Sequence, residues 1–251
     1  MSTDTLHVVT FNIHKGFSAF ARRLTVHDLR DKLRAVGADV VMLQEVQGMH
    51  EQHAVRHADW PAIPQYEFLA DSLWSDFAYG RNAVYDHGHH GNAILSRYPI
   101  RRWTNEDVSM SPFERRGLLH CEIDVPGWPL PLHCIDVHLG LLGIWRRQQM
   151  DRLRSRIEQR VPPGVPLIVA GDINDWTRRS GWKLSRELGF TEVFEHTSGR
   201  AARSFPASMP VLQLDRIYVR GFTVKLAHVH RGRLFAKLSD HTALSAILQR
   251  Q

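Results

Sequence analysis

The sequence predicts an α/β or α+β fold with mixed β-sheets, built as a single domain over residues 1–251. Apolar and β-branched runs alternate with helical segments along the whole chain. Two runs, Leu118–Val125 and Leu130–His138, flank a turn sequence and are expected to pair as antiparallel strands. The sequence contains no repeat, linker or low-complexity tract, and 251 residues suit one large domain.

The first half of the chain begins with a strand, a helix and a second strand. Leu6–Ile13 is β-branched and aromatic, as buried strands are. Residues 25–36 place apolar side chains at three- and four-residue steps, which predicts a helix with Gly37 as its C-cap. Val40–Val46 is the next strand, and a less regular stretch rich in His, Asp, Gly and Asn separates it from the strand Gly91–Arg97.

The second half continues with the paired strands and then a helix over Gly143–Val161, which Pro162 stops. The remaining predicted elements are the strand Pro166–Ala170, the helix Gly181–Leu188, and the strands Leu214–Val219 and Ala243–Leu248. Residues 195–213 are expected to form a long basic loop. The arginines of the Gly143–Val161 helix spread around it, which favours a solvated face over a surface that binds polyanions.

The composition is that of a globular protein with a moderately basic surface. A net charge of +6 and a pI near 9.7 favour polyanionic partners such as nucleic acid or anionic lipid, although good solubility alone accounts for a charge of this size. Cys121 and Cys134 are interpreted as reduced core residues. The first residues lack the features of a signal peptide, and no run of about 18 apolar residues exists, so a cytoplasmic location is expected.

Polar side chains suited to a metal or a phosphate follow several apolar runs directly. They are Asn12, Glu45, His138, Asp172 and Asn174, with Asp215 inside a later strand and Asp240 and His241 just before the last one. Side chains at strand ends are held by the sheet and reach an open rim. One carboxylate there is most often a cap or turn residue, but several that converge repel one another, and a divalent cation relieves that repulsion. Oxygen ligands favour Mg²⁺ or Mn²⁺ over Zn²⁺.

The ordered motifs resemble the endonuclease/exonuclease/phosphatase superfamily, which includes deoxyribonuclease I, exonuclease III-type repair nucleases, neutral sphingomyelinases and inositol polyphosphate 5-phosphatases. The motifs are TFNIH at 10–14, LQEV at 43–46, GNAILSR at 91–97, DVHLG at 136–140, GDIND at 171–175, LDRIYV at 214–219 and SDH at 239–241. The resemblance covers nearly the whole chain. It implies a four-layer, deoxyribonuclease I-like sandwich, in which helices flank two packed mixed β-sheets.

The resemblance also implies a role for each residue around a metal and a water molecule. Glu45 would be the principal Mg²⁺ ligand, Asn12 would support the metal or the phosphate, and Asp240 would complete the metal environment. Asp172 would position and deprotonate the attacking water, and Asn174 would hold Asp172 and a phosphate oxygen.

A second group of residues would contact the phosphate and the leaving group. His241 would hydrogen-bond a phosphoryl oxygen, Asp215 would orient His241, and His138 would lie on the leaving-group side. An aspartate that holds a histidine raises its pKa and fixes its tautomer, so this pair is chemically sensible without the resemblance. Arg116 would face the phosphate unless it belongs to a solvated edge, and Asn92 would contribute to substrate binding.

Three functions remain open at this stage. His14 and His138 are less like repair endonucleases than like deoxyribonuclease I, sphingomyelinases and phosphatases. The leading hypothesis is a Mg²⁺- or Mn²⁺-dependent phosphodiesterase, with nucleic acid slightly favoured as the substrate. The second is a phosphoesterase for a phospholipid or a small phosphorylated metabolite, with possible peripheral contact with anionic lipid. The third is a catalytically silent binding protein. An apolar rim at the site would favour lipid, and a long basic groove would favour nucleic acid.

Two further features have a plain interpretation. His89 and His90 are expected to lie in a solvent-exposed, Gly-rich turn rather than to bind metal. The loop sequence at 203–219 is expected to overhang the site and to help select the substrate, because loops on a rigid scaffold usually carry specificity. The sequence leaves the oligomeric state open.

Overall fold

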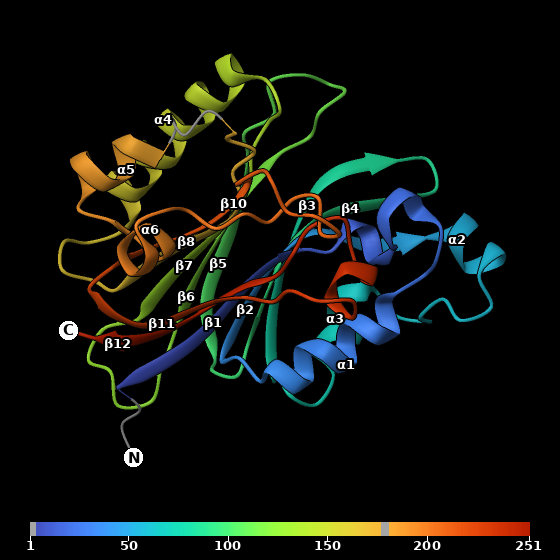
Figure 1. Ribbon diagram of the computed structural model, residues 1–251, viewed down its shortest axis with the longest axis horizontal. Coiled ribbons are helices and arrows are strands. Elements are labelled where there is room, and N and C mark those ends of the chain that lie inside the picture. Colours follow the sequence, from blue (N-terminus) through green and yellow to red (C-terminus); the bar gives the residue numbers. More distant parts are fainter. Residues whose placement is uncertain (1–3, 177–180) are drawn as a thin grey trace.

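Two six-stranded β-sheets pack face to face in the computed structural model of the protein, which describes residues 4–176 and 181–251 (Figure 1). The first sheet has the strand order β11-β12-β1-β2-β4-β3, and the second has the order β5-β6-β7-β8-β10-β9. Both sheets contain parallel and antiparallel pairs. Helices cover their outer faces (Figure 1), so the predicted sandwich of two mixed sheets between helical layers is confirmed.

The strands of the first sheet are β1 (Thr5–Asn12), β2 (Val40–His50), β3 (Asp76–Tyr85), β4 (Gly88–Ser96), β11 (Phe222–Val229) and β12 (Leu244–Arg250). Those of the second sheet are β5 (Ile100–Asp107), β6 (Gly117–Ile123), β7 (Leu132–His138), β8 (Leu167–Asp172), β9 (Thr191–Glu192) and β10 (Asp215–Arg220). The helices are α1 (Val26–Val36), α2 (Glu51–Arg56), α3 (Gln65–Ala70), α4 (Gly143–Arg160), α5 (Gly181–Leu188) and α6 (Val193–Ser198).

Three apolar layers hold the sandwich together. The central layer lies between the sheets, where Met42 and Ile94 of the first sheet share a cluster with Ile168 of the second. The two outer layers join α1 to the first sheet and α4 to the second, through side chains such as Leu29 and Leu153. Each layer removes apolar surface from water, which is the main force that fixes the order of the four layers.

The parallel strand pairs decide where the functional residues lie. β1 runs parallel to β2, and β7 runs parallel to β8, so the carboxyl ends of each pair emerge together. In register, His138 lies beside Asp172, and Asn12 lies beside Gln44. The pairing of β2 with β4 shifts between Leu43 and Val46, and this irregularity redirects the side chains of Gln44 and Glu45 between them.

Other expectations from the sequence meet mixed outcomes. Cys121 and Cys134 face each other across β6 and β7 as free, buried thiols, in agreement with their interpretation as core residues. The strands β3, β5, β9 and β11 and the helices α2 and α3 were not predicted, and α6 occupies the start of the stretch expected to be a loop. Within residues 4–176 and 181–251, no helix is both long enough and apolar enough to cross a membrane.

Candidate active site

The ends of four strands bring the predicted residues together at one edge of the sandwich. Asn12 ends β1 and Asp172 ends β8, so they belong to different sheets. The Nδ2 atom of Asn12 lies 3.1 Å from Oδ2 of Asp172 and 3.3 Å from Oε1 of Glu45. One buried amide therefore bridges the two sheets and holds two carboxylates beside each other.

Asp172 lies at the centre of this arrangement. Its Oδ1 accepts a hydrogen bond from the backbone N–H of Asn174 at 3.0 Å. Its Oδ2 lies 3.6 Å from Nε2 of His138 and 3.7 Å from Nε2 of His241. Burial raises the pKa of Asp172 to about 7, although the charge of His241 and the hydrogen bond from Asn12 act in the opposite direction. A carboxylate with this proton affinity is suited to act as a general base near neutral pH.

Asp215 and His241 form a hydrogen-bonded pair next to Asp172. Asp215 begins β10 directly opposite Asp172 in the antiparallel register of β8 and β10. The Nδ1 atom of His241 lies 2.8 Å from Oδ2 of Asp215. Burial acts to lower the pKa of His241, but the carboxylates of Asp215 and Asp172 outweigh it and raise the pKa to about 10. The imidazole is therefore cationic at neutral pH and directs Nε2 toward the space beside Asp172.

The turn after β8 is shaped by two residues with unusual backbone angles. Gly171 has φ +142°, and a Cβ atom there would lie 2.0 Å from the carbonyl oxygen of Val137, so no larger residue fits. Asn174 adopts φ +55°, and its Nδ2 donates to the carbonyl oxygen of Leu139 at 2.9 Å. Asn174 thus holds Asp172 through its backbone and the neighbouring loop through its side chain.

Glu45 is the carboxylate best placed to hold a divalent cation. Its side chain is 21% exposed, its Oε1 accepts from Asn12, and its Oε2 faces Lys15 Nζ at 3.9 Å. Burial acts to raise the pKa of Glu45, but Lys15, His14 and the Asn12 hydrogen bond outweigh it and keep the pKa below its usual value. An ionised carboxylate that keeps an open oxygen is the kind of ligand that Mg²⁺ or Mn²⁺ accepts.

A second group of possible ligands deserves comparison with Glu45. Among the described residues, Asp172, Asp215 and His241 offer ligand atoms that lie within 4.8 Å of one another. His241 is protonated, and its Nδ1 is already bonded to Asp215, so this imidazole has no lone pair to give. The oxygen-rich corner at Glu45 and Asn12 therefore fits a hard divalent cation better than the Asp215–His241 pair does.

The remaining predicted metal residue, Asp240, is half-buried beside this corner. Ser239 Oγ donates to the carbonyl oxygen of Asn12 at 2.7 Å and lies 3.2 Å from Oδ1 of Asp240. The carboxylate of Asp240 also raises the pKa of His241. The SDH motif is thus tied to the end of β1, while direct contact between Asp240 and Glu45 is not observed. The ligand role of Asp240 stays a prediction.

Two predicted substrate residues are engaged in contacts within the protein. Arg116 donates through Nε to the carbonyl oxygen of Leu139 at 3.1 Å and through Nη2 to Oε1 of Glu114 at 3.0 Å. Asn92 is fully buried and donates to the carbonyl oxygen of Asp136 at 3.2 Å. Arg116 is close enough to the site for its charge to lower the pKa of His138. Substrate contact by Arg116 and Asn92 stays a prediction.

Sequence reasoning missed two residues next to the site. His90 was expected in an exposed turn, but it is half-buried in β4, and the charges of His90 and Glu45 affect each other's pKa. Burial and Lys15 lower the pKa of His90 to about 4, so its imidazole is neutral. Arg146 of α4 was expected on a solvated face, but it is 2% exposed and donates to the carbonyl oxygen of Leu141 at 2.6 Å. Neither position carried a signal in the sequence.

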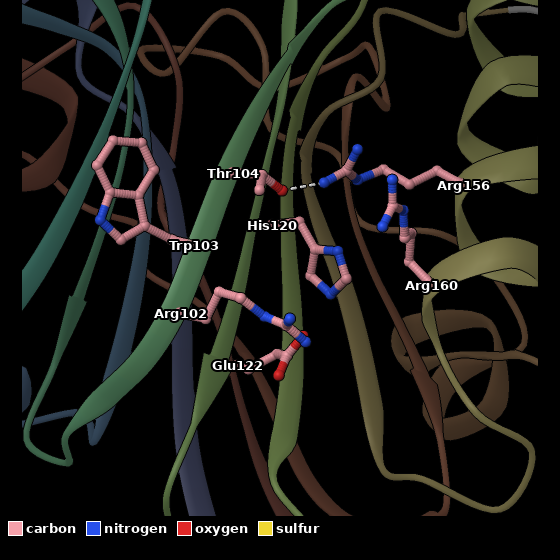
Figure 2. A pocket seen from close by; sticks show the side chains of 7 residues that line it. All are labelled: Arg102, Trp103, Thr104, His120, Glu122, Arg156 and Arg160. Carbon is pink, nitrogen blue, oxygen red and sulfur yellow. Dashed lines mark hydrogen bonds and ion pairs between the residues drawn. The ribbon is translucent and has the colours of Figure 1, made fainter.

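A separate cavity of about 140 Å³ lies between β5, β6 and α4 (Figure 2). Its lining includes Arg102, Trp103, Thr104, His120, Glu122, Arg156 and Arg160. His120 pairs with Ile135 in the middle of β6 and β7, whereas His138 lies at the end of β7. The cavity is therefore distinct from the candidate active site, and two of the arginines of α4 line it.

Comparison with known proteins agrees with this geometry. The sequence profile of the Endonuclease/Exonuclease/phosphatase family matches residues 9–241. The chain belongs to this family. It is 48% identical over 239 residues to the Uncharacterized protein YbhP of Escherichia coli (strain K12), which covers 95% of this chain and 94% of the relative.

Solved structures share the fold at lower sequence identity. An endonuclease/exonuclease/phosphatase from Beutenbergia cavernae superimposes with a TM-score of 0.80 at 24% identity, over 98% of this chain and 72% of that one. A mannosyl-6-phosphatase from Bacteroides thetaiotaomicron superimposes with a TM-score of 0.70 at 17% identity, over 97% of this chain and 99% of that one. These likenesses confirm the deoxyribonuclease I-like sandwich.

Proposed function

We propose that the protein is a Mg²⁺- or Mn²⁺-dependent phosphodiesterase in which Asp172 activates the attacking water. One observation carries this proposal: Asp172 lies between the imidazoles of His138 and His241, with Asn12 holding its Oδ2. Its pKa of about 7 suits proton abstraction, and the cationic His241 suits a phosphoryl oxygen that gains negative charge.

Other residues of the chain position Asp172, bind the phosphate and hold the cation. The backbone N–H of Asn174 fixes Oδ1 of Asp172, and Oδ2, which Asn12 holds beside the two imidazoles, takes the proton from water. His241 donates from Nε2 to the phosphate while Asp215 keeps its Nδ1 bonded. Glu45, with Asp240 nearby, would hold the divalent cation, which supplies charge neutralisation for the phosphate.

The ester group is inferred to be a phosphodiester. A basic chain of net charge +6 favours a polyanionic substrate, so nucleic acid and anionic phospholipid both qualify. A small phosphorylated metabolite is the third candidate, since one protein with this fold is named a mannosyl-6-phosphatase.

Hydrolysis of bis-p-nitrophenyl phosphate tests the chemistry without a choice of natural substrate. We expect cleavage with Mg²⁺ or Mn²⁺, none with EDTA, and a loss of at least ~100-fold in kcat for Asp172→Asn. Asp31→Asn serves as the control, because Asp31 lies on the exposed side of α1. Activity that persists in EDTA, or near-normal turnover by Asp172→Asn, would overturn the proposal.

A further inference from the structure

Five large apolar side chains lie exposed on three loops and on the first turn of α4, next to the candidate active site. We call them the apolar rim: Phe113 is 97% exposed, Leu141 49%, Leu142 51%, Ile144 58% and Trp176 48%. Isolated exposed apolar residues are common on proteins, but a group of this size on adjoining loops marks an interaction surface.

Hydrogen bonds and ring contacts join the three loops into one surface. The backbone N–H of Leu141 donates to Oε1 of Glu114, the neighbour of Phe113, at 3.0 Å. Arg146 donates to the carbonyl oxygen of Leu141, and its guanidinium lies 5.2 Å from the ring centre of Trp176. The apolar side chains are therefore held on a fixed support rather than on separate loops.

The apolar rim begins where the catalytic strands end. Leu141 and Leu142 follow His138 by a few residues, and Trp176 comes two residues after Asn174. Asn174 itself donates to the carbonyl oxygen of Leu139, which joins the two loops directly at the site. A surface that binds the apolar rim therefore lies against the mouth of the active site.

Other apolar side chains border the site from a different loop. Met209 is 70% exposed and Val211 is 51% exposed, within the loop that precedes β10. This loop contacts the site through the backbone N–H of Ala207, which donates to the carbonyl oxygen of Asp240 at 2.7 Å. The ring of Phe205 lies 5.0 Å from that of His241. Two sets of loops thus surround the catalytic residues with exposed apolar groups.

The exposed charged residues within the segments of the apolar rim are basic. Among residues 112–115 and 141–148, the exposed charged side chains are Arg115 and Arg147, and Arg115 lies 3.9 Å from the exposed carboxylate of Asp107 at the end of β5. The acidic residue in these segments, Glu114, is only 13% exposed and is bonded to Arg116. Exposed apolar groups with basic neighbours, on a chain of net charge +6, match a lipid bilayer that carries negative headgroups.

We propose that the apolar rim docks the protein onto an anionic phospholipid membrane, so that the active site meets lipid phosphodiesters at the bilayer surface. Membrane binding itself does not depend on the proposed function. The identity of the substrate does, because the membrane would supply the phosphodiester that the active site cleaves. A nucleic acid would be expected to contact a continuous basic groove, whereas Arg156 and Arg160 of α4 line a separate cavity between β5, β6 and α4 (Figure 2).

Sedimentation with lipid vesicles tests the docking directly. The probes are vesicles of phosphatidylglycerol mixed with phosphatidylcholine, and vesicles of phosphatidylcholine alone, with EDTA present so that no lipid is cleaved. The variant Phe113→Ser/Leu142→Ser/Ile144→Ser removes three apolar side chains of the apolar rim. We expect the wild type to bind the anionic vesicles and this variant to bind them at least ~10-fold more weakly.

A control variant removes three other exposed apolar side chains elsewhere. Val84, Leu130 and Leu226 are 67%, 46% and 53% exposed and lie outside the loops of the apolar rim. Their triple substitution to Ser is expected to leave vesicle binding unchanged. Thermal unfolding of both triple variants shows whether each is folded, and single substitutions at Phe113 and Ile144 replace the triple variant if it is not.

Several results would overturn the docking. These are no binding of anionic vesicles by the wild type at low salt, or equal loss of binding in the two triple variants. A dimer that only the Phe113, Leu142 and Ile144 substitutions dissociate, without vesicle binding, would assign the surface to a second copy of the chain. Vesicle binding without hydrolysis of bis-p-nitrophenyl phosphate would refute the proposed chemistry alone. Hydrolysis without vesicle binding would refute the docking alone.

Discussion

Replacing Asp215 with Asn separates the electrostatic role of this residue from a purely structural one. The substitution keeps the shape of the side chain but removes the negative charge 2.8 Å from Nδ1 of His241. Asp215 is 1% exposed, so no solvent ion replaces the lost charge. The carboxylate of Asp172 remains, but burial continues to disfavour the imidazolium.

The size of the effect follows from the pKa of His241. That pKa is about 10 in the wild type, and we expect it to fall to ~6.5 or below once burial is opposed by less negative charge. A change of ~3.5 pKa units corresponds to ~5 kcal/mol between the two protonation states. At pH 8.5, only ~1 in 100 variant molecules would then carry a protonated His241.

Two measurements follow this change. The first is kcat/KM for bis-p-nitrophenyl phosphate between pH 6 and 9, for the wild type and Asp215→Asn. We expect the variant to lose activity as pH rises through ~6.5, while the wild type loses none to this group until pH approaches 10. The second is NMR titration of the His241 ring nitrogens, which reports its pKa independently of turnover.

Uniform loss of activity at every pH would refute this reasoning. It would show that Asp215 fixes the position of His241, or holds the cation itself, without setting the charge of the imidazole. The same conclusion would follow from an NMR titration in which the pKa of His241 stays near 10 in the variant.

Four further predictions concern metal binding and stability. Glu45→Gln should weaken Mg²⁺ binding by at least ~10-fold in titration calorimetry, and unchanged affinity would remove Glu45 from the metal site. Burial raises the pKa of the Asp136 carboxyl, so the free energy of unfolding falls as pH rises and this carboxyl must lose its proton. Asp136→Asn should therefore keep or raise the Tm at pH 8, and a clear drop in Tm would contradict this. Burial lowers the pKa of His120 to about 3, so urea unfolding should show stability falling by up to ~1.4 kcal/mol per pH unit below 6.5, and less in His120→Gln; equal slopes would count against it. Gly91→Ala would place a Cβ atom 1.8 Å from a backbone carbonyl oxygen of β3 and should lower the free energy of unfolding by more than ~3 kcal/mol. Gly164→Ala meets nothing within 4 Å and should lower it by only ~1 kcal/mol. Similar losses of stability in the two variants would show that the sheet adjusts to the added Cβ atom.

Local sequence signals predicted the elements whose structure depends on near neighbours. The helix Val26–Val36 follows its apolar period, and Gly37 ends it with φ +66° and a hydrogen bond to the carbonyl oxygen of Leu33. These features are decided within one or two helical turns, so the chain alone contains the information. The same holds for β8, whose continuous apolar run at Pro166–Ala170 predicts a buried strand.

The strands that were missed depend on their partners. β5 reads IRRWTNED, and most of its side chains are exposed or half-buried, so no alternating or continuous apolar pattern identifies it. Pairing with β6 from Ile100 to Asp107 makes it a strand. β11 is similarly exposed and is defined by its register with β12. Such edge strands obtain their structure from a neighbouring backbone that the sequence does not place.

The candidate site was predicted in composition but not in its contacts. The motif order identified Asn12, Glu45 and Asp172, yet the bridge that Asn12 makes between two sheets depends on how the sheets pack. His90 was expected in an exposed turn because it approaches Glu45 only through the β2–β4 pairing, where the register shifts. No periodicity in the sequence reveals a shift of that kind.

Backbone strain at the site explains why local rules fail there. Six non-glycine residues in the described parts of the chain have positive φ, and four of them, His14, Lys15, Glu45 and Asn174, belong to the segments that form the site. Such a conformation costs ~1–2 kcal/mol for a residue like Glu, and it persists only where surrounding contacts over-determine it. At Glu45 those contacts are the β2 pairings on either side and the Asn12 amide. A glycine would relieve the strain but lose the carboxylate, so a strained glutamate at this position is best understood as the cost of presenting a charge to the site.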